Sequence, residues 1–449
     1  MIIVKYYYII LRMLKSRNST DRRVSPWSWV STLYFAQGLP YVAVMTISVI
    51  MYKRLGISNT DIALYTSWLY LPWVIKPFWS PVVDLFRTKR WWIIMMELLI
   101  AIGFAGVAFT IPATFFFQST LAVFWAIAFV SATHDIAADG YYMIALSEHD
   151  QSFYVGIRST FYRISTIVGQ GLLVMLAGYI ESRNDAVLPG ESMDYTPLAW
   201  MVVMAVLSVF FLLVSLYHRL VLPRSASDHP VPGVTLRNVG KEFLSTFISF
   251  FKKPNVGVAV AFMLLYRFPE AQLVKMINPF LLDGRDVGGL GLSTAQVGFV
   301  YGTIGIIGLT LGGIVGGIVA ARGGLKKWLM PMAWSISLTC GTFLYLAIVQ
   351  PDDMLSVNIC VFVEQFGYGF GFTAYMLYLI YFSEGPFRTA HYAICTGFMA
   401  LGMMLPGMMA GWLQEMMGYC GFFWWIIGCC VATIAVTSLI KVPASFGKK

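Results

Sequence analysis

Charge is scarce in this sequence. Of its 449 residues only 12% are charged and 58% are hydrophobic, whereas soluble domains carry roughly 25% charged residues. This deficit, together with a mean hydropathy of +0.72, excludes an ordinary soluble protein and predicts an integral membrane protein. The formal net charge is +9, but the basic residues cluster at one end of alternate apolar runs, which argues against nucleic-acid binding.

Cysteine is absent from the first half of the chain. The six cysteines lack the spacing of metal ligands, so we interpret them as apolar packing residues. They are Cys340, Cys360, Cys395, Cys420, Cys429 and Cys430. The sequence also lacks the spacing of a nucleophile and its base, so we expect a protein that is not an enzyme and needs no metal or cofactor.

Long apolar runs make up most of the sequence. A membrane span needs about 20 mostly apolar residues, and twelve segments of this kind can be placed along the chain. The first six are predicted over 27–52, 61–82, 91–111, 119–146, 154–180 and 197–221. The second six are predicted over 255–282, 294–321, 326–349, 354–382, 388–413 and 418–440.

One long polar interruption, from Leu222 to Lys253, divides the chain nearly in half. Its prolines and charges are typical of a linker. We therefore predict a cytoplasmic or interfacial segment over 1–26, a six-helix bundle over 27–221, a cytoplasmic linker over 222–254, a second six-helix bundle over 255–440 and a cytoplasmic tail over 441–449.

Basic residues outside the spans predict the orientation. Most of them lie on the side of the N-terminus, and the other side carries only Lys53, Arg54, Arg183 and Arg285. Under the positive-inside rule both termini are cytoplasmic.

Two basic turns occupy equivalent places in the halves. SPVVDLFRTKR follows the second predicted helix, and GGIVAARGGLKK follows the eighth. The pair resembles the loop signature of the major facilitator superfamily, which implies an all-α fold of two pseudo-symmetric six-helix bundles that rock about a central site. In the first copy Asp84, Arg87, Lys89 and Arg90 would form a cytoplasmic gate. The alternative is that these turns only set the topology.

The run SATHDIAADGYY, residues 131–142, places His134, Asp135 and Asp139 inside the fourth predicted helix. A charge near the bilayer centre costs at least about 2.5 kcal/mol and usually marks a pathway. Asp135 and Asp139 share one helical face, and we interpret them as proton-coupling carboxyl groups whose charged forms Arg163 would favour. A static ion-paired network is the alternative. His134 would relay protons, bind a sugar or serve only the structure.

In the seventh helix Arg267 and Glu270 flank Pro269, which predicts a break near the middle of the helix. Arg267 is a candidate ligand for a substrate carboxylate, since guanidinium binds carboxylates in a two-pronged geometry. Glu270 is a candidate coupling acid. The alternative is an internal pair between the two side chains.

Further candidates lie in other helices. Glu364 would be another coupling acid, and Gln365 beside it a substrate ligand. Tyr34 and Gln37 in the first helix suit a sugar, because aromatic faces stack on pyranose rings and polar tips meet the hydroxyls. Most membrane aromatics, however, only pack or lie at interfaces.

The 131–139 run also resembles the fourth-helix signature of AmpG-type muropeptide permeases and related acetyl-CoA transporters. KPFWSP at 76–81 and Tyr162-Arg163 agree with that group. The resemblance implies a monomeric, multi-pass, proton-driven importer of the inner membrane that takes an anhydro-muropeptide or a related amino-sugar saccharide, with Tyr162 and Arg163 in its binding site. Tyr142, Ile144 and the short linker depart from the family pattern, which leaves recognition of a peptide stem open.

Several alternatives stand beside this one. The substrate could be another anionic small molecule, such as a sialic acid, a sugar acid or a CoA-type metabolite. An enzyme acting on lipid-linked sugars and a ligand-sensing receptor are different classes. The repeat of the halves and the deep acids on several helices favour transport.

Overall fold

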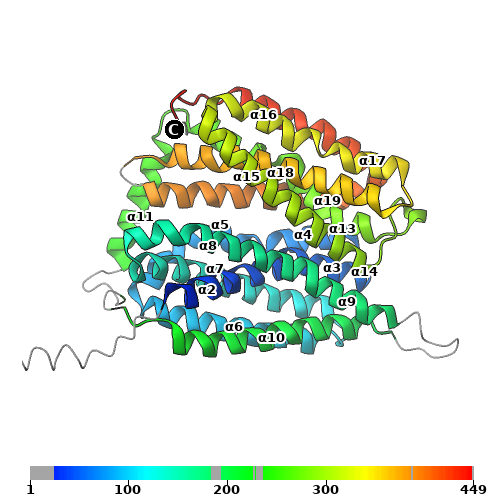
Figure 1. The fold of residues 1–449 in the computed structure, drawn as a ribbon, viewed down its shortest axis with the longest axis horizontal. Coiled ribbons are helices and arrows are strands. Elements are labelled where there is room, and N and C mark those ends of the chain that lie inside the picture. The colour runs from blue at the N-terminus through cyan, green and yellow to red at the C-terminus, as the bar shows by residue number, and fades with distance from the viewer. Residues whose placement is uncertain (1–24, 184–193, 226–227, 229–235, 386–387, 447–449) are drawn as a thin grey trace, which may run out of the picture.

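The computed structural model describes residues 25–183, 194–225, 228, 236–385 and 388–446. Within these ranges every regular element is a helix, so the predicted all-α class is confirmed. The helices run nearly parallel or antiparallel to one another in two layers (Figure 1). Most of the predicted N-terminal segment 1–26 and the last three residues of the tail lie outside the described ranges.

The first half of the chain forms the lower layer in Figure 1. Its spans, in order, are α2 (Pro26–Val42) with η1 (Ala43–Ile47) and α3 (Ser48–Arg54); α4 (Asn59–Trp68) with α5 (Leu71–Leu85); α6 (Lys89–Thr110); α7 (Phe116–Ala145); α8 (Glu148–Thr166) with η2 (Ile167–Leu173) and α9 (Val174–Glu181); and α10 (Thr196–Val221).

The second half forms the upper layer. Its spans are α12 (Val256–Leu265) with α13 (Phe268–Leu282); α14 (Thr294–Phe299) with η5 (Val300–Gly305) and α15 (Ile306–Gly323); α16 (Leu325–Leu338) with α17 (Gly341–Val349); α18 (Met354–Ser383); and α19 (Arg388–Ser438), with the short η4 (Arg285–Val287) after α13. Gly418, at φ 69° and ψ 173°, divides α19 into two crossings.

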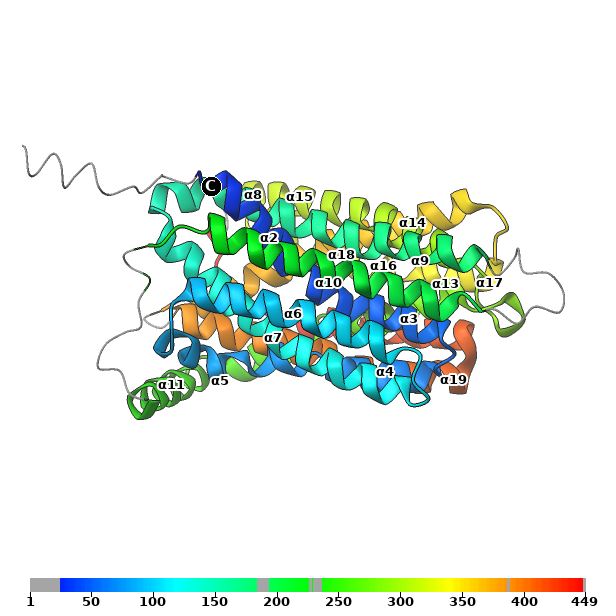
Figure 2. The same ribbon diagram turned by 90° about the horizontal axis from the view of Figure 1, so that it is seen from below.

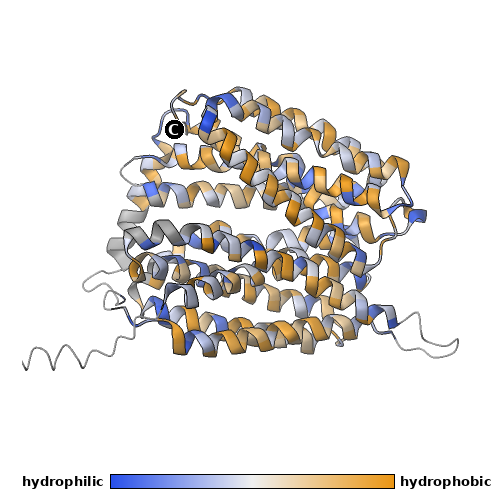
Figure 3. Cartoon of the chain, in the orientation of Figure 1, coloured by the Kyte–Doolittle hydropathy of each residue, from blue (hydrophilic) through white to orange (hydrophobic). Residues whose placement is uncertain are grey.

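Nine helical segments of the described chain are long and apolar enough to cross a membrane. One of them, Ala390–Ser438, is 49 residues long and contains the two crossings of α19. The pair α4–α5 and the 30-residue α18 complete the predicted twelve. Figure 3 shows hydrophobic residues along the lengths of these helices and hydrophilic residues gathered at their ends.

Capping residues explain where several helices begin. Ser58, Thr88, Ser147, Ser293 and Asp353 each accept a hydrogen bond from a backbone N–H in the first turn of the helix that follows. Such caps satisfy backbone donors that have no partner within the helix.

The linker contains a helix that the sequence analysis did not predict. α11 (Leu236–Phe251) lies beside the two layers at the end of the molecule where the C-terminus also lies (Figures 1 and 2). We call this end the linker end, and the other end the opposite end.

The two halves touch closely at the opposite end. A Cβ atom on Gly178 of α9 would lie 2.2 Å from the backbone nitrogen of Ala295 in α14, and one on Gly302 of η5 would lie 2.2 Å from the carbonyl carbon of Gln170 in η2. These glycines let the fifth and eighth spans pack backbone against backbone. The halves are therefore closed at the opposite end.

Candidate functional site

A cavity of about 760 Å³ separates the two halves. From the first half it is lined by Tyr34, Gln37, Arg158, Ser159, Tyr162, Arg163 and Thr166. From the second half it is lined by Ile306, Leu309, Gly313, Tyr368, Gly369, Phe372, Thr373, Met376 and Leu377. In the chain, the lining residues of α8 come before the glycine contact between the fifth and eighth spans, and the lining residues of α15 come after it. The cavity therefore lies between this contact and the linker end.

Four residues predicted for the substrate site lie on this wall, namely Tyr34, Gln37, Tyr162 and Arg163. Gln37 is 8% exposed, and its Oε1 has no hydrogen-bond partner among the described residues. A buried acceptor without a partner costs free energy. This oxygen is itself buried, so a ligand hydroxyl in the cavity would reach it only after the Gln37 side chain turns toward the cavity.

Arg163 reaches across the cavity. Its Nη1 lies 3.4 Å from Oγ1 of Thr310 on α15, and within the described chain it forms no ion pair. The prediction that Arg163 balances Asp135 and Asp139 is therefore wrong for this conformation. The cavity wall instead holds a guanidinium that pairs with no carboxylate of the described residues.

Arg158 takes the place that the sequence analysis assigned to Arg163. Its Nη2 lies 3.1 Å from Oδ1 of Asp139, and its guanidinium lies 4.4 Å from the centre of the Tyr34 ring. The hydroxyl of Tyr34 donates to the same carboxylate oxygen at 3.0 Å. Asp139 is thus held by one cation and one hydroxyl from two neighbouring helices.

Counting helical turns in the sequence could have identified Arg158 as the partner of Asp139. α7 and α8 are antiparallel neighbours in the chain, joined near Ser147. At 3.6 residues per turn, Arg158 lies about three turns beyond this connection and Arg163 more than four. Asp139 lies about two turns before the connection, so Arg158 is the closer in depth.

Asp135 faces a different helix from Asp139. Its Oδ2 accepts a hydrogen bond from Nε1 of Trp73 at 3.2 Å, and Nζ of Lys76 lies 3.8 Å from the same oxygen. The two aspartates therefore have separate partners, with Asp135 held against α5 and Asp139 against α2 and α8.

The predicted break in the seventh span is present. Arg267 has φ −103° and ψ 14°, between α12 and α13. Its Nε and Nη2 donate to the two carboxylate oxygens of Glu270 at 2.9 and 3.2 Å, and Nη2 also donates to the Tyr368 hydroxyl at 2.8 Å. This conformation therefore shows the internal pair between Arg267 and Glu270 that the sequence left as the alternative. It lies behind Tyr368 and Phe372, which form the cavity wall.

Neighbouring groups satisfy the backbone at this break. The hydroxyl of Thr433 lies 3.0 Å from the carbonyl oxygen of Tyr266 and 3.5 Å from that of Leu265, and it donates to these backbone acceptors. A broken helix within a membrane is tolerated where such partners exist.

Glu364 and Gln365 are buried in α18, 2% and 3% exposed. Nε2 of Gln365 donates to Oε2 of Glu364 at 2.7 Å. Neither residue lines the cavity in this conformation. The predicted roles of Glu364 in coupling and of Gln365 in substrate binding would therefore require a rearrangement of α18 or of the cavity wall.

His134 lies away from the cavity as well. It is 1% exposed, with Nε2 3.3 Å from Oε1 of Glu97. Nδ1 of His218 lies 2.6 Å from the same oxygen, and Nε2 of His218 lies 2.9 Å from Oγ1 of Thr32. His134 therefore does not line the cavity, and its imidazole belongs to a network with Glu97, His218 and Thr32 that joins four helices of the first half.

The predicted gate residues contact the linker. The carboxylate of Asp228 accepts hydrogen bonds from the backbone N–H groups of Lys89 and Arg90 at 2.7 and 3.0 Å, and Nε of Arg90 donates to the carbonyl of Leu222 at 2.9 Å. Arg87 stacks on Trp91 at 5.9 Å. The side chain of Asp84 lies outside the described part of the structure.

Further polar contacts between the halves lie at the opposite end. Glu181 accepts from Nε of Arg54 at 3.0 Å and from the hydroxyl of Thr294 in the other half. The backbone N–H of Thr60 donates to Oε1 of Glu415 across the same boundary at 3.0 Å.

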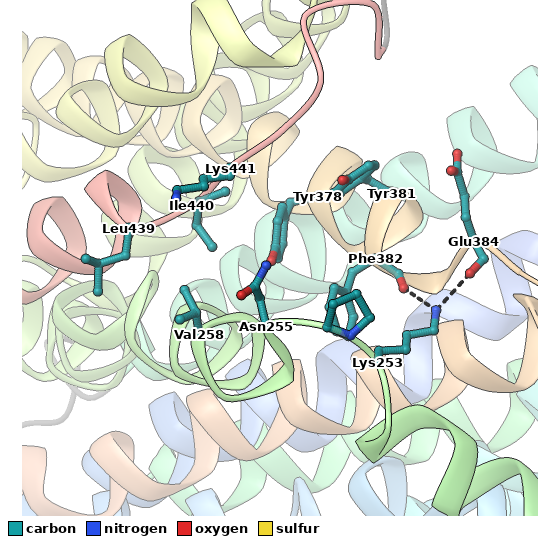
Figure 4. A pocket seen from close by; sticks show the side chains of 11 residues that line it. Lys253, Asn255, Val258, Tyr378, Tyr381, Phe382, Glu384, Leu439, Ile440 and Lys441 are labelled. Atoms are coloured by element: carbon teal, nitrogen blue, oxygen red, sulfur yellow. Dashed lines mark hydrogen bonds between the residues drawn. The ribbon is translucent and has the colours of Figure 1, made fainter.

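A second cavity, of about 610 Å³, lies at the linker end of the second half, beside Tyr378, Asn255 and Lys441 (Figure 4). Lys253 donates there to the carbonyl oxygens of Phe382 and Glu384 at 2.5 and 2.8 Å. All of its lining residues follow the linker helix in the chain, so it is not between the halves. Within the described ranges no three His, Cys, Asp or Glu side chains are arranged so that they could hold a metal ion.

Residues 30–411 match the sequence profile of the Major Facilitator Superfamily. A putative transporter AmpG 4 from Rickettsia conorii is 25% identical over 406 residues, which cover 87% of this chain and 90% of that protein. An anhydromuropeptide permease from Escherichia coli is 24% identical over 404 residues, covering 87% of this chain and 74% of the permease.

Solved structures share the fold. A D-xylose-proton symporter superposes with a TM-score of 0.65 at 16% identity, covering 94% of this chain and 98% of the symporter. The nucleoside transporter NupG superposes with a TM-score of 0.66 at 16% identity, covering 92% and 98%. At these identities the similarity shows the arrangement of helices alone.

Proposed function

The chain belongs to the Major Facilitator Superfamily and is a membrane transporter rather than an enzyme, and we propose that it imports an anhydro-muropeptide or related acidic amino-sugar saccharide by proton-coupled alternating access. The name of the Escherichia coli relative, an anhydromuropeptide permease, supports this substrate class. The identity to this relative is 24%, so support for the same substrate class comes from the residues of the cavity.

The observation that carries the proposal is the uncompensated guanidinium of Arg163 in the cavity. A cation there attracts a carboxylate, which it binds in a two-pronged geometry. Muramic sugars carry such a group on the lactyl ether. Tyr34, Gln37 and Tyr162 on the same wall supply an aromatic face and hydroxyl partners for the ring. A cavity of about 760 Å³ lies within the usual range for small-molecule sites.

Coupling would run through Asp139. Its carboxylate holds Arg158 at 3.1 Å, and the Asp139 side chain is 41% exposed. A proton that enters from water would neutralise the carboxylate and release Arg158, so protonation and rearrangement of the cavity wall are linked. Asp135, Glu270 and Glu364 are the remaining candidate acids.

The linker end is cytoplasmic in this proposal, because the basic residues outside the spans predict it. The cavity then faces the cytoplasm, and the closed opposite end faces the outside. The bundles 27–221 and 255–440 are the two bodies that rock, and the protein works as a monomer in the inner membrane.

The test is uptake of labelled 1,6-anhydro-N-acetylmuramic acid saccharides, with and without peptide, into proteoliposomes. We expect accumulation above the external concentration under an inward proton gradient and only equilibration without one. Equal uptake with and without the gradient would refute proton coupling. If a folded preparation does not take up these saccharides but transports another sugar acid, such as a sialic acid, the substrate belongs to that class instead.

A further inference from the structure

Lys275 is a lysine buried where the two halves meet. It lies in α13, and its side chain is 2% exposed. Nζ donates to Oγ1 of Thr66 at 2.9 Å and lies 5.3 Å from the centre of the Tyr70 ring. Both partners belong to the first half of the chain, whereas Lys275 belongs to the second. Within the described residues it makes no ion pair.

The surroundings of Lys275 do not neutralise it. A hydroxyl and an aromatic ring are weak substitutes for the water or carboxylate that an ammonium group normally has. Ser67 next to Thr66 is fully buried, and its hydroxyl has no partner among the described residues. A methyl group on Gly407 would lie 2.8 Å from this hydroxyl and 3.3 Å from Cγ of Lys275, so only glycine allows the backbone of α19 to pack this closely against both residues.

A purely structural role is a poor explanation for this lysine. Apolar residues of similar volume are usually at least as stabilising as buried charges, and an ionisable residue inside a membrane protein usually marks a functional path. The position fits such a path. Parting of the halves at the opposite end would separate α13 from Thr66 and Tyr70 and would expose the amino group of Lys275 to water.

Lys275 and Arg163 lie in different halves and at different depths. Lys275 lies about two turns from the opposite end of its span, Val256–Leu282. Arg163 lies more than four turns from the connection at Ser147, near the middle of the helical run from α8 to α9. Lys275 is therefore the nearer of the two to the opposite end. Neither has a carboxylate partner in the described structure.

We propose that Lys275 is the binding residue for the carboxylate of the transported molecule when the opposite end is open, and that Arg163 takes the carboxylate over when the linker end is open. This inference rests on the proposed function, since it assigns a second contact to the same acidic substrate. Lys275 then determines the preference for acidic over neutral sugars at the opposite end, from which the substrate enters.

The test compares 1,6-anhydro-N-acetylmuramic acid with its methyl ester, which keeps the size and loses the charge. Uptake from the opposite side is measured for the wild type, Lys275→Met and Lys275→Arg. Since hydrogen bonds to charged groups contribute about 1.5 to 3 kcal/mol, Lys275→Met should raise the KM for the acid roughly 10- to 100-fold. Its KM for the ester should change less than about twofold, and Lys275→Arg should recover part of the loss for the acid.

Two controls make the outcome decisive. Lys326→Gln removes an exposed lysine at the linker end and should change neither KM. Thermal melting in detergent should show Lys275→Met at or above the wild-type Tm, whereas a structural lysine would lower it. Equal losses for acid and ester, with wild-type uptake intact, would overturn the inference and leave the proposed function standing. Failure of the wild type to carry either compound would overturn both.

Discussion

Nζ of Lys53 lies 2.6 Å from Oδ1 of Asp283, and this ion pair joins the two halves at the opposite end. The other carboxylate oxygen of Asp283 accepts from the Tyr419 hydroxyl at 2.6 Å, and Nδ2 of Asn59 lies 3.1 Å from that hydroxyl oxygen. The lysine and aspartate side chains are 16% and 18% exposed. The pair is therefore shielded enough from water to favour the closed arrangement of this end.

Asp283→Asn should shift the protein toward the state that is open at the opposite end. Breaking a buried pair costs about 3 to 5 kcal/mol, and a partly exposed pair costs less, so we expect a shift in the populations of about tenfold. Distances between spin labels attached to the two halves at this end would report it. Arg285→Gln is the matched control, because Arg285 pairs with the exposed Asp352 within the second half. Unchanged distances in Asp283→Asn would show that the pair does not hold the end closed.

Gly302→Ala should also open this end, for steric reasons. Its new methyl group would lie 2.2 Å from the carbonyl carbon of Gln170, a distance that the two halves can relieve only by separating. We expect uptake to fall at least about tenfold, since overpacking costs about 1 to 3 kcal/mol. Gly317→Ala in the same span is the control, because nothing lies within 4 Å of its added methyl group. Wild-type uptake by Gly302→Ala would mean that the close approach is not needed for transport.

Asp139→Asn should uncouple transport from the proton gradient. The amide cannot take up a proton, so accumulation should stop while exchange of labelled for unlabelled substrate continues. Uptake with a gradient and counterflow without one are the two measurements. Asp352→Asn, which changes a carboxylate with a 96% exposed side chain, should leave both unchanged. Concentrative uptake by Asp139→Asn would remove Asp139 from the coupling mechanism.

Arg163→Gln should weaken binding of acidic substrates from the linker end. Loss of a charge-assisted contact should raise the KM for efflux of the acid roughly 10- to 100-fold, with little effect on its methyl ester. Arg158→Gln is the informative comparison, because its charge is already paired with Asp139 and its loss should disturb coupling more than charge selectivity. The same loss for acid and ester in Arg163→Gln would contradict the role proposed for this residue.

His134→Gln should affect stability and leave the substrate KM within about twofold of the wild type. The imidazole is buried against Glu97, and disturbing a buried hydrogen bond costs about 1 to 3 kcal/mol, which should lower the Tm. Thermal melting and the KM for uptake are the measurements. A large rise in KM at unchanged Tm would restore the predicted contact of His134 with the substrate.

Much of the fold can be predicted from local sequence. Apolar runs of about 20 residues define the spans because the hydrocarbon thickness sets their length. Pro269 between two charges predicts the break at Arg267, because proline removes a helix hydrogen bond. α11 was missed because a helix within a polar linker lacks the long apolar run by which the spans were found.

The sequence by itself determined that this chain crosses a membrane many times, that its two halves are alike, and that acids and arginines lie inside its helices, because hydrophobicity and residue spacing are local properties. Only the tertiary structure decided that Arg158 rather than Arg163 meets Asp139, that Lys275 and Arg163 have no carboxylate partner among the described residues, and that Lys53 pairs with Asp283 across the two halves. Those outcomes depend on how each helix is rotated and how deep it lies against its neighbours, and packing between helices distant in the chain sets both.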